Sequence, residues 1–324
     1  MKYTSKDLAV IIPTKDRPKQ MRKHLQSLLD QQCELGRIIV VASGKNIEDI
    51  VLGFNDQLHV EYYSSEPGQI RQRNMGISKL DERTKLVACM DDDVTYNEDA
   101  VNEIIRFWNS VEPDTAGVGF KIINMSTIKH NWFRGFLGFS SAKPGQVLKS
   151  GLSTPIHNAE KNIRVQWLNG GSTVWRQDIL MANSLQEINT SRACNEDLIF
   201  SYPLGKKYPL YVCSDAKVEI EEMLYINEQL INKNTKELYI YSGRERCLWN
   251  LYFVMINEDL SVNKFILRQL IYCMAQMFKG AIYFDKKRYF TTFGFIKGLF
   301  MSSRTLLGLQ TVDEFKSKFI DSLN

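Results

Sequence analysis

Three consecutive carboxylates directly after a short apolar run constrain the fold of this chain more than any other feature of its sequence. Leu86–Met90 is continuously apolar, which predicts a buried strand, and Asp91, Asp92 and Asp93 follow it directly. In open α/β sheets, ligands sit at the carboxyl edge where such strands end. Adjacent carboxylates repel one another unless a cation offsets their charge, and oxygen ligands suit Mg²⁺ or Mn²⁺. A solvated acidic loop explains the same residues, so the surroundings have to decide.

Strand and helix patterns alternate around this stretch. Apolar, β-branched runs predict strands at 8–12, 37–41 and 59–63, and helical spacing of apolar residues predicts helices at 19–32, 69–79 and 98–110. Such alternation predicts an α/β fold with a doubly wound, mostly parallel sheet flanked by helices. We expect further strands at 117–123, 165–168 and 210–213, a functional loop over 126–162, and a helical, aromatic region after about residue 241.

Composition narrows the class of protein. With 44% hydrophobic and 24% charged residues, the chain has the composition of a globular protein. A net charge of +4 is too small to indicate a nucleic-acid partner. The six cysteines include no Cys-x-x-Cys pair, so we expect buried thiols in a reducing compartment and no zinc site. The apolar run at 8–12 is too short for an export signal, which predicts a cytoplasmic location.

Three further groups of residues are candidates for chemistry, each with a plainer explanation. Arg71 and Arg73 precede the acidic strand and offer cationic donors to a diphosphate, or they are solvated helix residues. Asn169-Gly-Gly-Ser172 presents backbone amides to sugar hydroxyls, or it is only a turn. Glu196 and Asp197 precede an apolar run, where one acts as a general base or both simply start a helix.

The order of these motifs resembles that of glycosyltransferase family 2, the inverting enzymes of the GT-A fold. The likeness covers roughly residues 8–220, and the matching segments are Val10-Ile-Ile-Pro-Thr14, Gly68-Gln-Ile-Arg-Gln-Arg-Asn-Met-Gly76, Met90-Asp-Asp-Asp-Val94, Trp167-Leu-Asn-Gly-Gly171 and Glu196-Asp197. The resemblance implies a GT-A catalytic domain over 1–240, with a nucleotide-sugar half at about 1–115 and an acceptor half at about 116–240. A helical, aromatic and basic region would follow over 241–324.

The resemblance implies a metal-dependent inverting transfer from a nucleotide-sugar donor to a glycan or lipid-linked glycan, in surface polysaccharide synthesis. The cofactor would be a divalent metal, Mn²⁺ or Mg²⁺. A sugar nucleotidyltransferase is an alternative, but the segment Pro13-Thr-Lys-Asp-Arg17 lacks the Gly-rich, basic loop expected after its first strand. A second alternative is a non-catalytic scaffold that binds glycan or lipid through a degenerate transferase domain.

The resemblance also assigns roles to individual residues. Asp197 matches the family's catalytic base, with Glu196 beside it as the second candidate. Asp93 would hold the metal with Asp91, while Asp91 or Asp92 would lie near the ribose and donor sugar. The remaining residues of the nucleotide-sugar pocket would be Pro13, Thr14, Arg17, Ser43, Arg71, Arg73 and Asn74, with Gly170 and Gly171 as the floor under the donor sugar or acceptor.

Two positions depart from the family's pattern. The family usually carries an acid after its second strand that contacts the base, but here the sequence is Ala42-Ser43-Gly44, which leaves Ser43 as the candidate. Many members have a histidine after the last strand that completes the metal site, whereas this chain offers Glu219, Glu221 and Glu222. The nucleotide and the third metal ligand therefore stay open.

The C-terminal region predicts an interfacial surface. Over residues 265–284 the polar side chains cluster on one side of a helix and leave a wide apolar face, with too many interruptions for a membrane span. Basic and aromatic residues follow at 285–290 and suit an anionic lipid surface, which places the protein peripherally on the inner face of the membrane. Packing against the catalytic domain or another subunit explains the same face.

Overall fold

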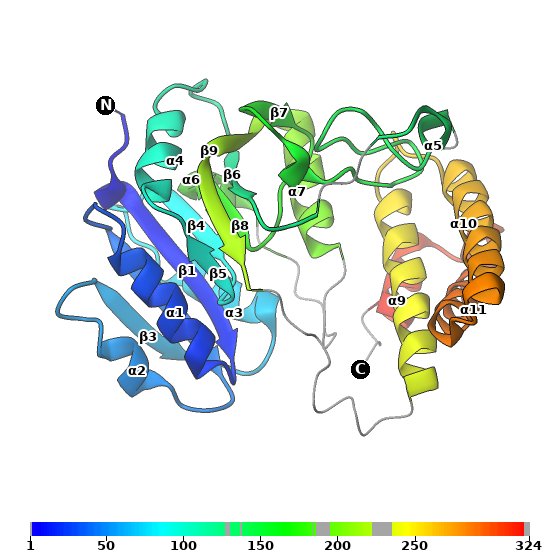
Figure 1. Cartoon of the computed structure of the whole chain (residues 1–324), viewed down its shortest axis with the longest axis horizontal. Helices are drawn as coiled ribbons and strands as arrows, with labels where there is room; N and C mark the ends of the chain where they lie inside the picture. Colours follow the sequence, from blue (N-terminus) through cyan, green and yellow to red (C-terminus); the bar gives the residue numbers. More distant parts are fainter. Residues whose placement is uncertain are drawn as a thin grey trace.

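An α/β unit and a C-terminal helical unit lie side by side in the computed structural model (Figure 1). The structure describes residues 2–126, 130–136, 138–183, 185, 195–221 and 235–320. The expected α/β fold with flanking helices and a helical C-terminal part is confirmed.

The sheet of the α/β unit has a parallel half and a mixed half. Within the described ranges its main path runs β3 (Val60–Ser64), β2 (Arg37–Ser43), β1 (Leu8–Lys15), β4 (Leu86–Met90), β8 (Ser172–Arg176), β6 (Gly117–Ile122), β9 (Leu210–Ile220) and β5 (Val94–Tyr96), with β7 (Ile163–Val165) paired to β9. The four strands from β3 to β4 are parallel, and β8 is antiparallel to both of its neighbours. The carboxyl ends of β1, β2 and β4 therefore meet at one edge.

Alternate side chains of the central strands enter two different cores, as the two-residue period of a strand requires. On one side, Val10 and Val40 pack under α1 (Pro18–Leu29), α2 (Glu48–Leu52) and α4 (Ala100–Trp108). On the other side, Ile11 and Ile39 pack under α3 (Gln69–Ser78), α6 (Gln177–Ala182) and α7 (Glu196–Lys207). Short helices also occur outside these layers: η1 (Ser5–Asp7), α5 (Trp132–Phe136) and η2 (Ile156–Asn158).

The helical unit is built on a close crossing of two helices. It comprises α9 (Thr235–Met255), α10 (Val262–Tyr283), α11 (Lys286–Met301), α12 (Ser303–Leu306), α13 (Val312–Phe315) and η3 (Lys316–Ile320). At the crossing of α9 and α11, a Cβ added to Gly243 would lie 2.9 Å from the Thr291 carbonyl carbon, and one added to Gly294 would lie 2.9 Å from the Arg244 nitrogen. Backbone therefore packs on backbone there, which only glycine permits.

The helical unit also packs on the α/β unit. Ile70 of α3 shares a core with Leu248 and Trp249 of α9. The carboxylate of Asp259, between α9 and α10, accepts a hydrogen bond of 2.5 Å from the Tyr202 hydroxyl of α7 and pairs with Lys206. The helix α3, which carries Arg73, thus packs on α9 through Ile70 and on the sheet through Ile77. No helix in the described ranges is sufficiently long and apolar to traverse a bilayer.

The sequence located most elements, with informative differences. The expected strand at 165–168 lies at 163–165, the strand expected at 210–213 continues to Ile220, and the C-terminal helices begin at Thr235. Strands β5 and β8 were not predicted, because three to five residues beside an acidic loop or a Gly-Gly turn give little periodicity. The five cysteines in the described ranges are free thiols, as expected.

Candidate active site

Asp92 ties the loop after β1 to the end of β4. Its Oδ2 accepts a hydrogen bond of 2.6 Å from the Thr14 hydroxyl, and its Oδ1 accepts one of 2.8 Å from Arg17 Nη1. The Asp92 residue is only 4% exposed, and burial raises its pKa while the contacts with Thr14 and Arg17 oppose that rise. Asp92 is therefore an anchor that fixes Thr14 and Arg17 at the strand ends.

The Asp93 carboxylate is largely buried and lies close to two other negative charges. Burial, followed by the negative charges of Asp91 and Asp92, raises its pKa to about 6. Arg17 Nη1 lies 3.5 Å from its Oδ2, and its backbone oxygen accepts a hydrogen bond of 2.8 Å from the nitrogen of Glu221, just after β9. A cation beside Asp93 would relieve this repulsion.

The donor set for a metal is incomplete within the described residues. They contain no cluster of three or more His, Cys, Asp or Glu side chains that could hold a metal ion. Asp93 and Asp91 are oxygen donors of the right chemistry, and the segment after Glu221, including Glu222, lies outside the described ranges. The chemistry of these two carboxylates and the charge repulsion at Asp93 fit a divalent cation.

Asp91 is held by two side chains from one face of α3. Arg73 Nη2 donates to Asp91 Oδ1 at 2.6 Å, and Gln69 Nε2 donates to the same oxygen at 2.8 Å. The two donors are four residues apart and so share a helix face, whereas Arg71 lies roughly 200° around the helix from Arg73. Arg71 is half-buried, and the Arg73 side chain is 3% exposed.

Gln72 fixes α3 against the strand ends. Its amide nitrogen donates to the Thr14 carbonyl at 2.7 Å and to the Val41 carbonyl at 2.6 Å, and the residue is 3% exposed. The sequence did not single out Gln69 or Gln72 as site residues. The four-residue spacing between Gln69 and Arg73 was the available signal for the first; nothing local distinguishes the second.

The Gly-Gly turn passes close to both Asp91 and the second acidic pair. A Cβ on Gly171 would lie 2.8 Å from Asp91 Oδ1 and closer still to its Oδ2 and Cγ, and the Gly171 carbonyl accepts a 2.9 Å hydrogen bond from the Asp91 nitrogen. A Cβ on Gly170 would lie 2.9 Å from Arg73 Nη1 and 3.5 Å from Glu196 Oε1. The turn thus lets backbone approach charged side chains where no larger residue fits.

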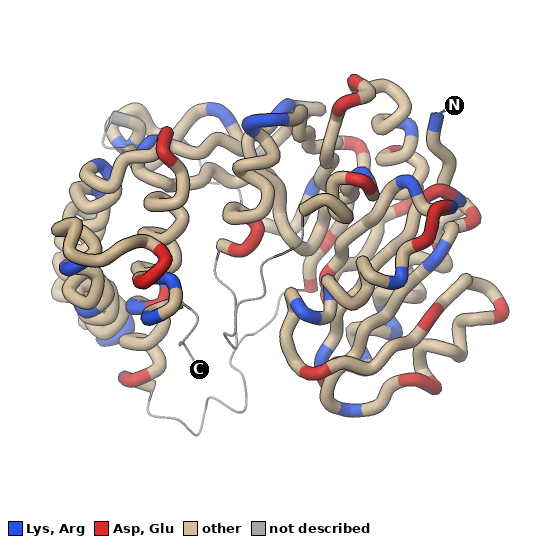
Figure 2. Tube along the Cα trace, turned by 180° about the vertical axis from the view of Figure 1, so that it is seen from behind, with Lys and Arg blue, Asp and Glu red and all other residues tan. Residues whose placement is uncertain are grey.

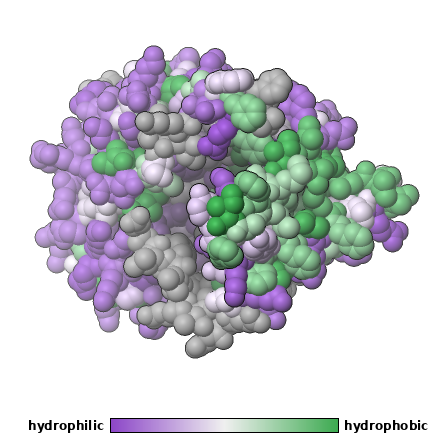
Figure 3. Space-filling view, turned by 45° about the vertical axis from the view of Figure 1, so that its right-hand side comes forward, coloured by the Kyte–Doolittle hydropathy of each residue, from purple (hydrophilic) through white to green (hydrophobic). Residues whose placement is uncertain are grey.

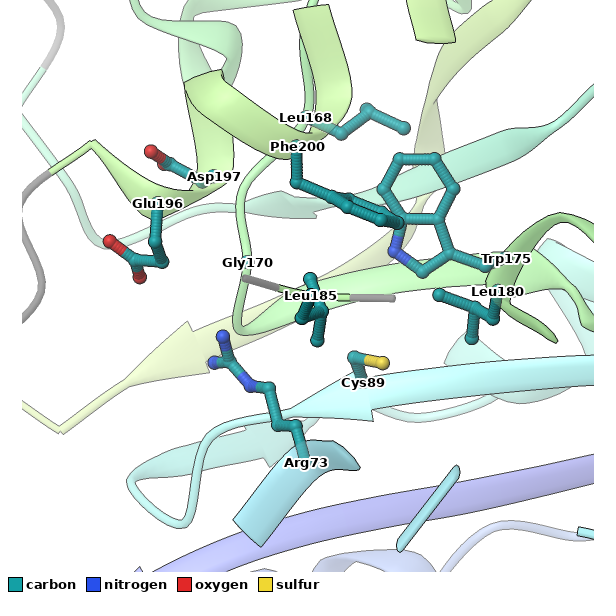
Figure 4. Close-up of a pocket in the computed structure, with 10 residues that line it drawn as sticks. All are labelled: Arg73, Cys89, Leu168, Gly170, Trp175, Leu180, Leu185, Glu196, Asp197 and Phe200. Carbon is teal, nitrogen blue, oxygen red and sulfur yellow. The ribbon is translucent and has the colours of Figure 1, made fainter. Parts of the chain in front are cut away.

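Glu196 and Asp197 open α7 beside Arg73. Figure 4 shows the Arg73 guanidinium directed toward Glu196 and Gly170, with Asp197 next to Glu196. Burial and then the negative charge of Glu196 raise the pKa of Asp197, while Arg73 and a hydrogen bond of 2.8 Å from the Leu198 nitrogen oppose this. A buried carboxyl with a raised pKa is suited to proton transfer near neutral pH.

The pocket beside this pair is apolar on its other side. Besides Arg73, Gly170, Glu196 and Asp197, it is lined by Cys89, Leu168, Trp175, Leu180, Leu185 and Phe200 (Figure 4). The indole of Trp175 meets the Phe200 ring edge-on, with centroids 5.2 Å apart. Asn74, a predicted site residue, donates to the Leu185 carbonyl at 2.9 Å and so positions this wall.

The remaining predicted residues lie at the ends of β1 and β2. Pro13 is buried in β1 opposite Val41, and Ser43 is 3% exposed with a hydroxyl that has no hydrogen-bond partner among the described residues. An acid does lie beside the end of β2, although it comes from the loop after β1. The Asp16 carboxylate accepts a 2.8 Å hydrogen bond from the Lys45 nitrogen, and a Cβ on Gly44 would lie 2.8 Å from Asp16 Cγ.

Carboxylates and an arginine gather at the carboxyl edge of this α/β sheet, which is the edge where open α/β sheets bind their ligands. The model of Glycosyl transferase family 2 matches residues 9–179, which is more than half of the chain. The chain belongs to Glycosyl transferase family 2.

Solved structures share the fold. The mannosyltransferase PcManGT from Pyrobaculum calidifontis, in complex with GDP-Man and Mn²⁺, superposes with a TM-score of 0.52 at 12% identity, covering 92% of this chain and 88% of its own. S. aureus TarS 1–349 in complex with UDP-GlcNAc gives a TM-score of 0.51 at 17% identity, covering 81% and 72%. A comparison with curated protein sequences gave no match.

Proposed function

We propose that this glycosyltransferase moves a sugar from a nucleotide-sugar donor to a hydroxyl acceptor with inversion, using Asp197 as the general base. The observation that carries the proposal is the position of Arg73. It pairs with Asp91 at 2.6 Å and lies beside Gly170, whose other neighbours are Glu196 and Asp197. A group bound at Arg73 therefore lies between the acidic strand end and the candidate base.

The donor's nucleotide would lie over the ends of β1 and β2. Thr14 and Arg17 are fixed there by Asp92, and the buried Ser43 hydroxyl beside them has no hydrogen-bond partner among the described residues. Asp16 supplies an acidic group beside Gly44, where the sequence lacks the acid that the family usually carries. The bound GDP-Man and UDP-GlcNAc of the two structural neighbours support a nucleotide-sugar donor but leave its identity to experiment.

Asp93 and Asp91 would hold a divalent metal, and the Mn²⁺ bound to the archaeal mannosyltransferase supports this cofactor. When bound, the metal would neutralise charge on the donor's diphosphate. Arg17 is fixed by Asp92 close to Asp93, and Arg73 is fixed by Asp91 on the opposite side of the strand end. Both arginines are therefore preorganised for the negative charge that develops on the leaving nucleotide.

Asp197 would accept the proton of the acceptor hydroxyl as its oxygen attacks the anomeric carbon. The bond to the nucleotide breaks on the opposite face of the sugar, so one displacement inverts the anomeric centre. The Leu198 nitrogen donates a hydrogen bond of 2.8 Å to Asp197 Oδ1 and so fixes the carboxylate at the start of α7. Glu196 would raise the basicity of Asp197 by repulsion rather than take the proton itself.

The proposed acceptor is a glycan or lipid-linked glycan, and the proposed process is surface polysaccharide synthesis. The rings of Trp175 and Phe200 pack against each other behind the acid pair, with Trp175 only 3% exposed, so they would shape the wall of the acceptor side without contacting the acceptor. We place the enzyme in the cytoplasm at the inner face of the membrane, where lipid-linked acceptors are available.

Thermal stabilisation by a panel of nucleotide sugars, with and without Mn²⁺, tests donor and metal together. The active donor should raise the melting temperature more with Mn²⁺ than without it. Asp197→Asn should keep this stabilisation and lose transfer, while Glu196→Gln should keep measurable transfer. Undiminished turnover by Asp197→Asn would remove Asp197 from its role, and donor binding without hydrolysis or transfer to any glycan would favour the scaffold alternative.

A further inference from the structure

The outer surface of α10 and α11 exposes large apolar side chains in a regular pattern. On α10 they recur at spacings of three and four residues, which places them on one face, and α11 continues this face. We call this surface the α10–α11 face; its members include Leu267, Leu270, Met274, Phe278, Phe293 and Phe300. Phe278 is 68% exposed and Phe300 is 80% exposed. Figure 3 shows the hydrophobic surface of this unit as one contiguous area.

The turn between the two helices extends the same surface. Tyr283 is 72% exposed and Phe284 is 90% exposed, and Phe284 adopts a left-handed backbone conformation at φ 50°. A phenylalanine at a left-handed helix end is unfavourable on steric grounds and gains no burial here. Burial against something outside the chain would offset both costs.

The opposite side of α10 packs against other helices of the same unit. Phe265, Gln269 and Cys273 are buried against α9 and α11, and Arg288 of α11 donates a 2.5 Å hydrogen bond to Gln276. The apolar face is therefore additional to the packing that holds the helical unit together. Contiguous exposed apolar surface on this scale marks an interaction site.

The charge around this face has one sign. Residues 262–309 contain eight Lys and Arg residues and a single acidic residue, a net charge of +7, although the whole chain has only +4. Lys286 and Lys297 share the exposed side of α11 with Phe293 and Phe300, and Lys279 flanks the apolar side of α10. Figure 2 shows Lys and Arg along these outer helices.

We infer that the α10–α11 face docks on an anionic lipid bilayer, with its aromatic side chains at the level of the acyl chains and its lysines among the headgroups. Apolar side chains interspersed with lysines are the composition of helices that lie in a membrane interface. A second copy of this chain fits less well, because a two-fold contact would bring Lys279, Lys286 and Lys297 of both copies together.

Docking on this face would keep the catalytic pocket, which lies in the α/β unit, outside the bilayer. The helical unit packs on α3 through Ile70, one turn from Arg73. Figure 3 shows a hollowed area between the hydrophobic surface and the α/β unit. The docking inference rests on the proposed function only for its biological setting, because lipid binding is measured without donor or acceptor.

Flotation of the full chain with phosphatidylcholine vesicles, with and without phosphatidylglycerol, tests the inference. We expect binding to the anionic vesicles that weakens as salt is raised. Phe278→Ser combined with Phe300→Ser should lower the partition coefficient by about 100-fold or more, about tenfold for each ring. Lys279→Glu combined with Lys297→Glu should weaken the preference for phosphatidylglycerol, because the net charge of residues 262–309 falls from +7 to +3.

Matched controls lie at the far side of the α/β unit and on α7. Leu52→Ser, at a 41% exposed leucine of α2, and Lys207→Glu should bind vesicles as the unchanged protein does. Asp197→Asn should also bind normally, so failed transfer and failed docking are distinguishable. Equal binding by the double phenylalanine variant would overturn the inference. So would a folded protein that binds neither vesicle type, or that forms dimers which this double variant abolishes.

Discussion

Replacing Gly171 with alanine tests whether backbone clearance beside Asp91 controls the site. The added Cβ would lie 2.8 Å from Asp91 Oδ1 and closer to Oδ2 and Cγ, whereas an ordinary carbon contact begins at about 3.5 Å. The carboxylate therefore has to move by more than half an ångström. Such a shift breaks its 2.6 Å and 2.8 Å hydrogen bonds from Arg73 and Gln69.

The expected loss follows from the contact that is broken. A hydrogen bond between charged groups contributes about 1.5–3 kcal/mol, so transfer by Gly171→Ala should fall by about 10- to 100-fold. Initial rates of transfer measure the effect, and Gly53→Ala, a remote glycine with φ −60°, is the control that should keep full activity. Activity of Gly171→Ala within twofold of the unchanged protein would refute the reasoning.

Substitutions of Glu196, Asp197, Asp93 and Gln72 have distinct expected outcomes. Because Asp197 must be ionised to act as a base and Glu196 raises its pKa, transfer should rise with pH, and Glu196→Gln should move that rise to lower pH in a pH–rate profile. The pKa of Asp197 is higher in the folded protein than in the unfolded chain, so the folded protein loses stability as pH rises between those two values. Asp197→Asn removes this loss and should melt at a higher temperature than the unchanged protein near neutral pH. Asp93→Asn should abolish Mn²⁺-dependent thermal stabilisation by the donor. Gln72→Ala removes the hydrogen bonds that the side chain donates to two buried carbonyls. It should lower the free energy of unfolding, measured in urea, by about 2–4 kcal/mol, which is far more than Gln69→Ala should.

The parallel half of the sheet was predictable because its strands are short, apolar and separated by clear helices. Both faces of these strands are buried, with Val10 on one face and Ile39 on the other. Each strand therefore forms a continuous apolar run in the sequence. β8 was missed because its residues, Ser172 to Arg176, are stabilised by pairing with β4 and β6, partners that are distant in sequence.

Site residues could be predicted from the sequence where charged residues are adjacent to one another. Roles that depend on contacts formed in the fold could not be predicted. The acidic triplet and the Glu196-Asp197 pair are visible as charges next to apolar runs. The division of labour among them is not visible, since Asp92 becomes an anchor only because Thr14 and Arg17 approach it in the fold. Likewise, Asp16 reaches the end of β2 only through its left-handed backbone at φ 56°.

Glycines of the helical unit allow the effect of close packing on stability to be separated from the effect of helix propensity. A Cβ on Gly294 would lie 2.9 Å from the Arg244 nitrogen and closer to the Ile240 carbonyl, and neither backbone group can move without parting α9 from α11. Gly294→Ala should therefore destabilise the protein by about 1–3 kcal/mol, despite alanine's better helix propensity.

Gly280→Ala is the matched variant, because its Cβ would meet only the Tyr289 ring, at 3.2 Å, and a side chain can yield. Its alanine should be neutral or stabilising by up to about 1 kcal/mol. Urea unfolding of the two variants compares them directly. Equal effects would mean that α11 is not fixed by backbone contact with α9. Side-chain packing of Phe295 against Cys247 and Cys273 would then hold α11 in place.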